Sequence, residues 1–461
     1  MQDRTWKTAL WDTSWDELYE GKFSEEGTCR FTKNGGASLE IPFGDISKTR
    51  ILKTTGRYTE GIEPKRFDHL FGITQDGNRL ALCNALSRGV GESIPGSTFE
   101  TFCAPTVLAS RSEFDPAAPM ISAQFEIALL NDWLGLRYSP VHREDTYTFN
   151  FGTGSLSLPL HISSDACVEI RAGIKRPRET ASGTSIPYYC HICVEYPYGK
   201  VIDEIWRTEL WRLQSLLAFC FGTYPEITSA KVRRERDGSW IHVYRSSANT
   251  GRGAKLSPQP PIPFHQLGRD GLLQMAENWI ALGDDEWHAA QMLTSLLGSW
   301  NMPLDLELLA ATTMFESLIR ANRPPLFGEE ELETISRPII EAADEKVRKR
   351  VAGLIKLLDK PSYTTMLNEA YEESKPWGEH LIPRWSKFRD EQYSLRIGGA
   401  HGISSDKDPY LRIDHYHAQI VLAYFILMKR LGLSPEAIDQ FERSSFLNAS
   451  RWDISKRYSR P

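Results

Sequence analysis

The sequence predicts an α+β chain with an N-terminal antiparallel β-rich domain at residues 1–245 and a C-terminal all-α helical-bundle domain at residues 264–461. Strand-like alternation and tight-turn signals are concentrated in the first region. Residues 246–263 carry glycines and prolines without apolar periodicity, which is typical of a linker. Beyond it, apolar residues recur at helical spacing. The domain boundary is therefore expected in this segment.

Composition limits the classes of function. With 461 residues and 41% hydrophobic content, the chain can bury more than one core. The formal net charge of -6 argues against a globally basic nucleic-acid-binding protein, so any RNA contact requires a local basic patch. Met1–Lys7 lacks an apolar signal region, and the apolar run Ala418–Met428 is too short to span a bilayer. We expect a soluble, cytoplasmic protein without membrane contact.

The seven cysteines lie between Cys29 and Cys220 and follow no framework spacing, which favours reduced thiols over disulfides. Cys190-His191-Ile192-Cys193 has no second Cys/His pair at a matching distance and lies in a strand-like run. Core cysteines explain it better than a zinc site does.

The N-terminal strands are predicted by their turns. Trp6–Tyr19 shows no regular period, whereas Gly21–Phe31 and Ala37–Ile41 flank Asn34-Gly35-Gly36 and are expected to form a hairpin. Asn-Gly supplies the positive φ angles that a tight hairpin turn needs. The same pattern predicts strands at Ile51–Tyr58, His69–Thr74 and Arg79–Cys83, with a turn at Asp76-Gly77.

A second β stretch follows, in which every other residue is apolar, as expected for strands of a sheet with one buried face. The alternating residues are Tyr147, Phe149 and Phe151, then Leu156, Leu158 and Leu160, then Val168 and Ile170. Helical spacing predicts one helix at Ile202–Phe221, before strands at Glu226–Val232 and Ser239–Tyr244. The basic run Lys231, Arg233, Arg234 and Arg236 is interpreted as a solvated strand edge.

The C-terminal region is predicted to be wholly helical. Expected helices are Leu272–Leu282, Glu286–Trp300, Leu304–Ala321, Glu330–Leu358 with a kink at Pro338, Ser362–Glu373, Leu381–Leu395 and Ile413–Leu431. Ser434-Pro435 should begin a last helix, with a cap residue followed by proline at the first position. The basic run Lys346–Arg350 is interpreted mainly as a solvated helix face. Ile413–Leu431 should be the central helix.

One short segment combines groups suited to phosphodiester chemistry. Arg396 and His401 are separated by four residues that include Gly398 and Gly399. Arginine can hold a phosphate through a planar fork of donors, and histidine can transfer a proton near pH 7. Neither task needs a metal or a cofactor. The plain alternative is that the two glycines end a helix at Leu395 or Arg396.

This R-x4-H segment, which ends in Ala-His-Gly within a C-terminal helical region, resembles the HEPN ribonuclease family and its ApeA-like branch. Gly21-Lys22-Phe23 and the hairpin FDHLFGITQDGNRLALCNA from Phe67 resemble the accompanying ApeA N-terminal domain. The resemblance implies a metal-independent, cofactor-free endoribonuclease that forms homodimers or higher oligomers. It also implies defence against phage by cleavage of host RNA such as tRNA, with the N-terminal domain as a recognition or sensor domain and a phage protein as a candidate trigger.

The resemblance further implies roles for individual residues. His401 would act as general acid or base, Arg396 would stabilise the phosphoryl oxygens, and the products would carry a 2′,3′-cyclic phosphate. Weaker substrate-binding candidates are Gly398, Gly399, Arg389, Lys387 and Glu316. No residue is assigned to a metal.

Two alternatives from other classes remain open. The family usually has Asn, Asp or His after the arginine, and this chain has Ile397. The helical domain could therefore be a catalytically degenerate module that binds RNA or nucleotides and dimerises. Alternatively, the N-terminal region is the working part, a sensor that the bundle only oligomerises. Other chemistry finds little support: Gly89-Val-Gly91 lacks the lysine of a phosphate loop, and His415 and His417 lie on different helix faces.

Overall fold

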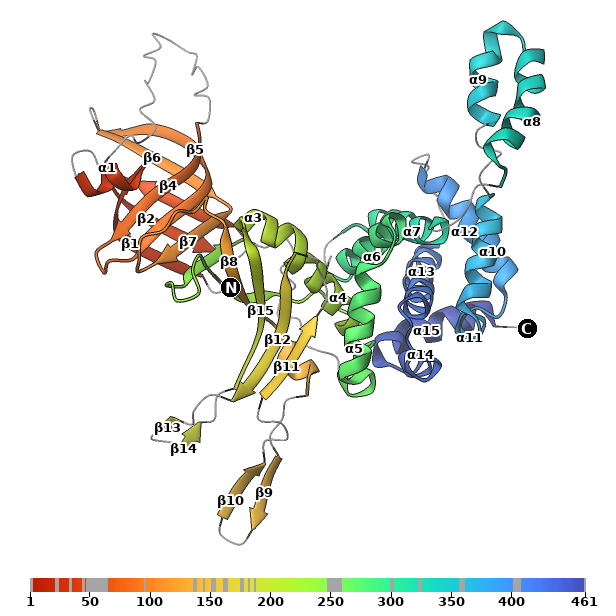
Figure 1. Cartoon of the computed structure of the whole chain (residues 1–461). Helices are drawn as coiled ribbons and strands as arrows, with labels where there is room; N and C mark the ends of the chain where they lie inside the picture. The colour runs from red at the N-terminus through yellow and green to blue at the C-terminus, as the bar shows by residue number, and fades with distance from the viewer. Residues whose placement is uncertain are drawn as a thin grey trace. The chain divides into compact units, whose positions relative to one another are not determined.

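The structure is a computed structural model of the whole chain (Figure 1). It describes residues 3–20, 25–32, 35–43, 46, 65–94, 97–135, 139–143, 146–150, 155–160, 165–174, 178–180, 183–185, 188–246, 259–298, 302–321, 326–355, 361–400 and 408–459. The chain forms two compact units. The β unit comprises Met1–Leu217 with Tyr224–Lys255, and the helical unit comprises Ala218–Thr223 with Leu256–Pro461. None of the described helices is both long and apolar enough to cross a membrane.

The first six strands of the β unit close into an antiparallel barrel. They are β1 (Arg4–Asp12), β2 (Glu25–Thr32), β3 (Gly36–Ile41), β4 (Arg66–Thr74), β5 (Arg79–Ile94) and β6 (Ser97–Ala104). They pair in the order β5-β4-β1-β2-β3-β6, and β6 returns to pair with β5. Fully buried Trp11 fills space beside Gly72, where an added Cβ would come within 2.8 Å of the indole ring. The lack of a side chain at Gly72 therefore lets Trp11 pack against β4.

The remaining long strands extend this sheet from β5. They are β7 (Thr106–Ser110), β8 (Met120–Ile127), β11 (Ser155–Leu160), β12 (Cys167–Ile174), β15 (Tyr188–Lys200), β16 (Ile227–Arg233) and β17 (Ile241–Arg245). Among the described residues they continue the order as β7-β17-β16-β8-β15-β12-β11. Two small hairpins, β9 (Ser139–Arg143) with β10 (Thr146–Asn150) and β13 (Arg178–Thr180) with β14 (Gly183–Ser185), form separate sheets. The predicted antiparallel β-rich region is confirmed.

Some local predictions for the β unit were wrong. Trp6–Tyr19 is not irregular, because it contains most of β1 and the short helix α1 (Trp15–Glu20). Lys231 and Arg233 are not on a sheet edge, because they belong to β16, which pairs with both β8 and β17; Arg234 and Arg236 follow this strand and are exposed. Within the run, the cations of Lys231 and Arg233 lie 4.6 and 4.8 Å from the ring centroid of Trp240. The predicted strand at residues 51–58 and Phe151 lie outside the described residues.

The predicted helix at residues 202–221 is present as α3 (Ile202–Ile205), a π-helical turn (Trp206–Leu210) and α4 (Trp211–Phe221). The last residues of α4 belong to the helical unit. There the ring of Phe219 stacks on Tyr424, with centroids 4.6 Å apart. The Tyr424 hydroxyl donates a hydrogen bond of 3.1 Å to the carbonyl oxygen of Phe219. These residues are thus part of the core of the helical unit.

The helical unit contains α5 (Phe264–Ile280), α6 (Asp284–Leu296), α7 (Leu304–Arg320), α8 (Glu329–Ala342), α9 (Glu345–Ile355), α10 (Tyr363–Ser374), α11 (Trp377–Leu381), α12 (Trp385–Ala400), α13 (Pro409–Arg430), α14 (Pro435–Glu442) and α15 (Ser445–Tyr458). In α13 every residue from Ala418 to Met428 is buried, which confirms it as the central helix. The predicted fold class, a β-rich region followed by a largely helical region, is confirmed.

Three predicted helix boundaries were wrong. The helix expected from Glu330 to Leu358 breaks at Ala343 and Asp344, between α8 and α9, and Pro338 lies within α8. The helix that carries Arg396 does not end at Leu395 or Arg396 but continues as α12 to Ala400. The helix that begins after Ser434 is α14, which is followed by a further helix, α15.

Candidate active site

Two residues that the sequence placed 80 positions apart meet in a bidentate ion pair. Arg396 on α12 donates from Nε to Oε2 of Glu316 at 3.0 Å and from Nη2 to Oε1 at 2.9 Å. Glu316 belongs to α7 and its side chain is 14% exposed, whereas the side chain of Arg396 is 33% exposed. Two parallel charge-assisted bonds fix both the position and the plane of the guanidinium. One face of Arg396 thus remains accessible from solvent.

Two neighbours complete the surroundings of this pair. The guanidinium carbon of Arg396 lies 4.6 Å from the ring centroid of Tyr363, which is buried on α10. Arg320, one turn after Glu316 on α7, bonds the same carboxylate. The hydrogen bonds to Glu316 raise the pKa of Arg396 above its usual value. Two arginines therefore share one carboxylate, which gives this Glu316–Arg320–Arg396 cluster a net charge of about +1.

The donors of Arg396 are only partly used. A guanidinium carries about five N–H groups in a fixed fork. Nε and Nη2 bond Glu316, and Nη1 has no hydrogen-bond partner within the described residues. The Nη1 side can therefore donate to an anion without loss of the Glu316 pair. The guanidinium fork suits phosphate as well as carboxylate, so a phosphate group is one anion that these donors can bind.

The other predicted site residues differ in where the structure places them. His401 directly follows Ala400, the last residue of α12, and lies outside the described residues. Gly398 and Gly399 belong to the last turn of α12, but their surroundings are outside the description. Arg389 lies seven residues before Arg396, about two helical turns along the same face, and its Nη2 bonds neighbouring Asp390 at 2.8 Å.

Lys387 lies nine residues before Arg396 on α12, which places it on about the opposite side of the helix. Its ammonium lies 5.5 Å from the ring centroid of Tyr458 and 4.0 Å from Oε1 of Glu391. It therefore contributes to a different group of residues. Glu316 and Arg396 are the predicted site residues that the structure brings into contact.

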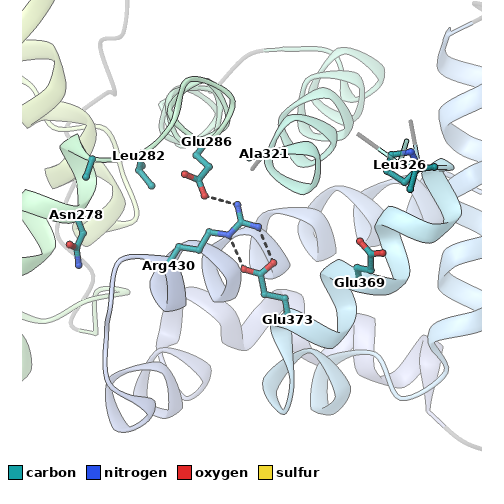
Figure 2. Close-up of a pocket in the computed structure, with 10 residues that line it drawn as sticks. Asn278, Leu282, Glu286, Ala321, Leu326, Glu369, Glu373 and Arg430 are labelled. Carbon is teal, nitrogen blue, oxygen red and sulfur yellow. Dashed lines mark hydrogen bonds and ion pairs between the residues drawn. The ribbon is translucent and has the colours of Figure 1, made fainter. Parts of the chain in front are cut away.

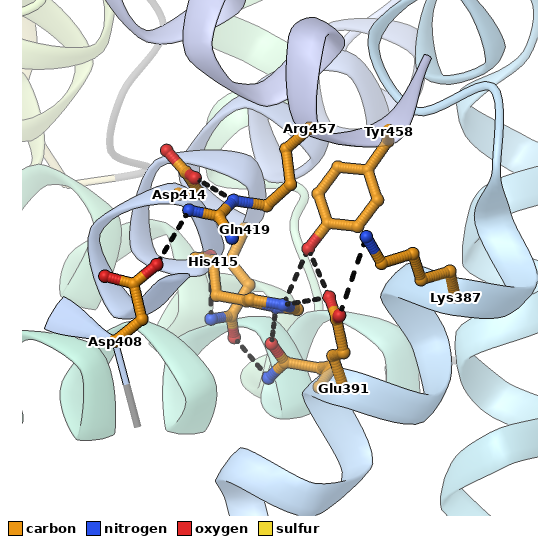
Figure 3. Close-up of polar contacts among 9 residues, drawn as sticks. Lys387, Glu391, Asp408, Asp414, His415, Gln419, Arg457 and Tyr458 are labelled. Atoms are coloured by element: carbon orange, nitrogen blue, oxygen red, sulfur yellow. Dashed lines mark hydrogen bonds and ion pairs between the residues drawn. The ribbon is translucent and has the colours of Figure 1, made fainter. Parts of the chain in front are cut away.

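That different group is a buried polar network beside α12 (Figure 3). Fully buried His415 on α13 faces Oε1 of Gln392 through Nδ1 at 2.8 Å, and the Tyr458 hydroxyl through Nε2 at 2.9 Å. The Tyr458 hydroxyl also donates to Oε2 of Glu391 at 2.7 Å. The ring of Phe388 stacks on His415 with centroids 4.5 Å apart. Helices α12, α13 and α15 are joined at this point.

The electrostatics of the network follow from its burial. Burial lowers the pKa of His415, although the hydrogen bond to Glu391 opposes that effect. Burial, and then the Glu391 carboxylate, raise the pKa of Tyr458 far above its usual value. Both side chains are therefore neutral near pH 7. The network fixes helix positions and offers no acid or base poised to titrate near neutrality.

The network continues toward the Arg396 pair. Nε2 of Gln392 donates to Gln419 at 3.2 Å and to the Tyr363 hydroxyl at 3.5 Å. Tyr363 is the residue whose ring lies against Arg396. Gln392 also precedes Arg396 by one helical turn. The buried network therefore contributes to the placement of the guanidinium through α12 and Tyr363.

A pocket of about 750 Å³ lies elsewhere in the helical unit (Figure 2). Its wall carries Arg430, which holds Glu373 through Nε at 2.8 Å and Nη2 at 2.9 Å, and Glu286 through Nη1 at 2.8 Å. Glu369 also lines it. Arg430 is the basic residue among the described residues that line this pocket, and its guanidinium is already bonded to two carboxylates. The pocket is a poorer candidate for RNA chemistry than the surroundings of Arg396.

Metal and thiol chemistry have little basis in the described residues. They contain no group of three or more His, Cys, Asp and Glu side chains that could hold a metal ion. All seven cysteines are free thiols. Burial raises the pKa of Cys29, Cys83 and Cys190 to about 12, so these thiols stay protonated near pH 7.

Sequence reasoning missed the residues that support Arg396. Tyr363, Gln392 and Tyr458 lie on three different helices, and nothing in their local spacing marks them. The one available signal was a run of polar and aromatic residues on α12 before Arg396, from Phe388 to Gln392. Fixed partners of this kind become visible only when the helices are packed.

The comparisons with known proteins bear on the N-terminal part of the chain. Residues 10–271 match the family model described as ApeA N-terminal domain 1. No curated protein and no solved structure gives a match. Since the matched residues are more than half of the 461-residue chain, the chain belongs to the ApeA N-terminal domain 1 family.

Proposed function

We propose that this chain is a HEPN-type endoribonuclease that cleaves host RNA, such as tRNA, in the cytoplasm as a defence against phage. Membership of the ApeA N-terminal domain 1 family and a largely helical C-terminal region support this proposal. The observation that carries it is the geometry of Arg396. Its plane is fixed by Glu316, its Nη1 has no hydrogen-bond partner in the part of the chain that the structure describes, and it precedes His401 by little more than one helical turn of sequence.

The proposed reaction uses groups that the chain itself supplies. The ribose 2′-oxygen attacks the adjacent phosphorus, the bond from phosphorus to the 5′-oxygen breaks, and a 2′,3′-cyclic phosphate forms. One histidine takes the proton from the 2′-OH, and an acid gives a proton to the departing 5′-oxygen. Arg396 donates to the phosphoryl oxygens, and the net positive charge of the Glu316–Arg320–Arg396 cluster favours the negative charge that develops there.

This reaction favours a homodimer as the active form. Each chain contributes one His401 and one Arg396, whereas a base and an acid are both needed at the scissile bond. A second copy would supply the missing proton-transfer group. The β unit would then act as the sensor or recognition part, with a phage protein as the trigger.

Cleavage of a radiolabelled tRNA pool by the full-length chain tests the proposal. Arg396→Ala and His401→Ala should each lower the rate about a hundredfold or more, as loss of a charge-stabilising group or general base does. The matched control is Arg443→Ala, which removes an exposed arginine elsewhere in the helical unit and should leave the rate unchanged. EDTA should have no effect, and the products should carry the cyclic phosphate.

The same assay discriminates the binding-only alternative. A chain that binds RNA in a filter assay but leaves it intact under all conditions would support a degenerate module, in keeping with Ile397. Full cleavage by the double variant Arg396→Ala/His401→Ala would place the active site elsewhere and refute the proposal.

A further inference from the structure

Helices α8 and α9 form a hairpin in which almost no side chain is buried. The two helices lie side by side and contact each other, with Ala343 and Asp344 between them (Figure 1). No residue of α8 is buried, and in α9 only Ile355 is. By contrast, α7 has seven buried residues from Leu308 to Ile319, and α13 has buried residues along most of its length. The α8–α9 hairpin, residues 329–355, is therefore an element whose packing surface is still open.

The open surface carries an apolar stripe on each helix. Ile335 and Ile339 of α8 are 37% and 46% exposed, and Val347 and Leu354 of α9 are 46% and 56% exposed. With Leu332 and Val351, which are half-buried, the apolar residues recur three and four positions apart on both helices. This spacing is typical of helices whose seam packs against another helix.

The two helices carry opposite charge. Helix α8 has five glutamates and one arginine, a net charge of -4, whereas α9 has four basic residues and one glutamate, a net charge of +3. The basic residues Lys346, Arg348, Lys349 and Arg350 are all exposed. Arg337 bonds Glu333 on its own helix, and within the described residues no ion pair joins α8 to α9. In the described residues 329–355, the charged side chains of the two helices are therefore not paired with each other and can pair with a partner.

We propose that the α8–α9 hairpin docks on the same hairpin of a second copy of this chain, with α8 of each copy against α9 of the other. A two-fold interface brings together the same patch from both copies, so an acidic helix meets a basic one twice. The apolar stripes are covered in the same contact. An RNA strand would use α9 alone, would meet repulsion from the carboxylates of α8, and would leave the apolar stripes exposed.

The size of the surface sets the strength of the contact. At about 1.5 Å of rise per residue and about 10 Å of width per helix, each hairpin offers a face of roughly 20 by 20 Å. That is about half of the ~800 Å² that each partner buries in a stable complex. The contact should therefore be weak, depend on protein concentration, and be most effective when the chains also meet at another surface.

Charge reversal in the full-length chain tests the proposal by sedimentation velocity without RNA. The first variant is Glu330→Lys/Glu331→Lys/Glu341→Lys, and the second is Lys346→Glu/Lys349→Glu/Arg350→Glu; all six residues are exposed. Each variant alone should raise the dissociation constant of self-association at least tenfold, because two like-charged helices then face each other. Circular dichroism checks that both variants keep their helices.

Two recoveries distinguish this contact from general charge effects. A 1:1 mixture of the two variants should associate like the unmodified chain, since the basic α8 of one meets the acidic α9 of the other. A chain that carries all six substitutions should also recover. If both variants associate as tightly as the unmodified chain, or if neither recovery occurs, the proposal is wrong. Loss of RNA binding by the second variant with unchanged self-association would assign the hairpin to RNA instead.

The outcome is independent of the proposed nuclease. The hairpin variants leave Arg396 and His401 in place, and the association measurement contains no substrate. Failure of the docking proposal appears as unchanged sedimentation. Failure of the proposed function appears as absent RNA cleavage by the unmodified chain.

Discussion

Replacing Tyr458 with phenylalanine removes a single oxygen from the centre of the buried polar network. That oxygen lies 2.7 Å from Oε2 of Glu391 and 2.9 Å from Nε2 of His415. The ring itself is retained, together with its edge contact to Phe388. The substitution therefore tests the hydrogen bonds without the cavity that a smaller residue would create.

The expected cost follows from what each partner can do afterwards. Glu391 is 28% exposed, so water can replace the lost donor. His415 is fully buried, and among the described residues its Nε2 would retain only the contact of 3.5 Å to Glu391. A buried polar group left unsatisfied costs about 1–3 kcal/mol, so we expect a loss of about 2 kcal/mol in the free energy of unfolding. For a unit of about 200 residues, this corresponds to a fall of about 4–8 °C in Tm.

Urea unfolding of the full-length chain, followed by circular dichroism at the helical band, measures the effect. The matched control is Tyr410→Phe on α13, where the tyrosine is 71% exposed; it should change the free energy of unfolding by less than about 0.5 kcal/mol. Equal effects of the two substitutions, or a loss below about 0.5 kcal/mol for Tyr458→Phe, would refute the view that this hydroxyl satisfies a buried histidine.

Three further predictions concern pH, the site and the barrel. Burial lowers the pKa of His415, so below about pH 6.5 this histidine is protonated in the unfolded chain while it stays neutral in the folded chain. The free energy of unfolding should therefore fall as the pH drops below about 6.5. Urea titrations at pH 7.5 and 5.5 measure this, and stability that is higher at pH 5.5 would contradict it. Replacing 38%-exposed Ile397 by asparagine should preserve or raise the RNA cleavage rate, because the amide adds a polar partner near phosphate without opening a core; a loss above tenfold would count against it. Gly72→Ala should destabilise the chain by about 1–3 kcal/mol in thermal unfolding, since its Cβ would overlap the buried ring of Trp11, whereas the control Gly353→Ala meets no atom within 4 Å and should not.

Local pattern predicted the elements whose burial is regular. The hairpin of β4 and β5 was found because Asp76-Gly77 marks its turn, and α13 was found because its apolar residues run almost without interruption. Strand β1 was not predicted, because its large apolar residues Trp6, Leu10 and Trp11 are not spaced two positions apart. The strand exists because β2 and β4 supply hydrogen bonds on both sides, which is tertiary information.

The helix boundaries show the same limit. Pro338 was expected to kink a long helix, yet proline is accommodated within α8, and the break falls at Ala343 instead. There the backbone adopts an extended conformation, and Asp344 accepts a hydrogen bond from the backbone N–H of Lys346 at 2.9 Å. An acidic residue that caps the next helix was a usable signal. Pro338, the more conspicuous residue, predicts the wrong position for the break.

The candidate site was predictable in its members more than in its arrangement. Glu316 and Arg396 were both singled out, but no spacing could show that residues 80 positions apart form a bidentate pair. The tyrosine beneath Arg396 and the network around His415 depend on the packing of four helices. The immediate surroundings of His401 lie outside the described residues, so its role stays a prediction.

The end of α4 also decides which fragments of this chain can fold. A fragment that begins at Pro263 would lack Phe219, so Tyr424 would lose both its stacking partner and the acceptor of its hydroxyl. Both side chains are fully buried in the intact chain, so removal of Phe219 would leave a gap beside the central helix. An expression fragment of the helical unit should therefore begin before α4, near residue 202, and include residues 246–263.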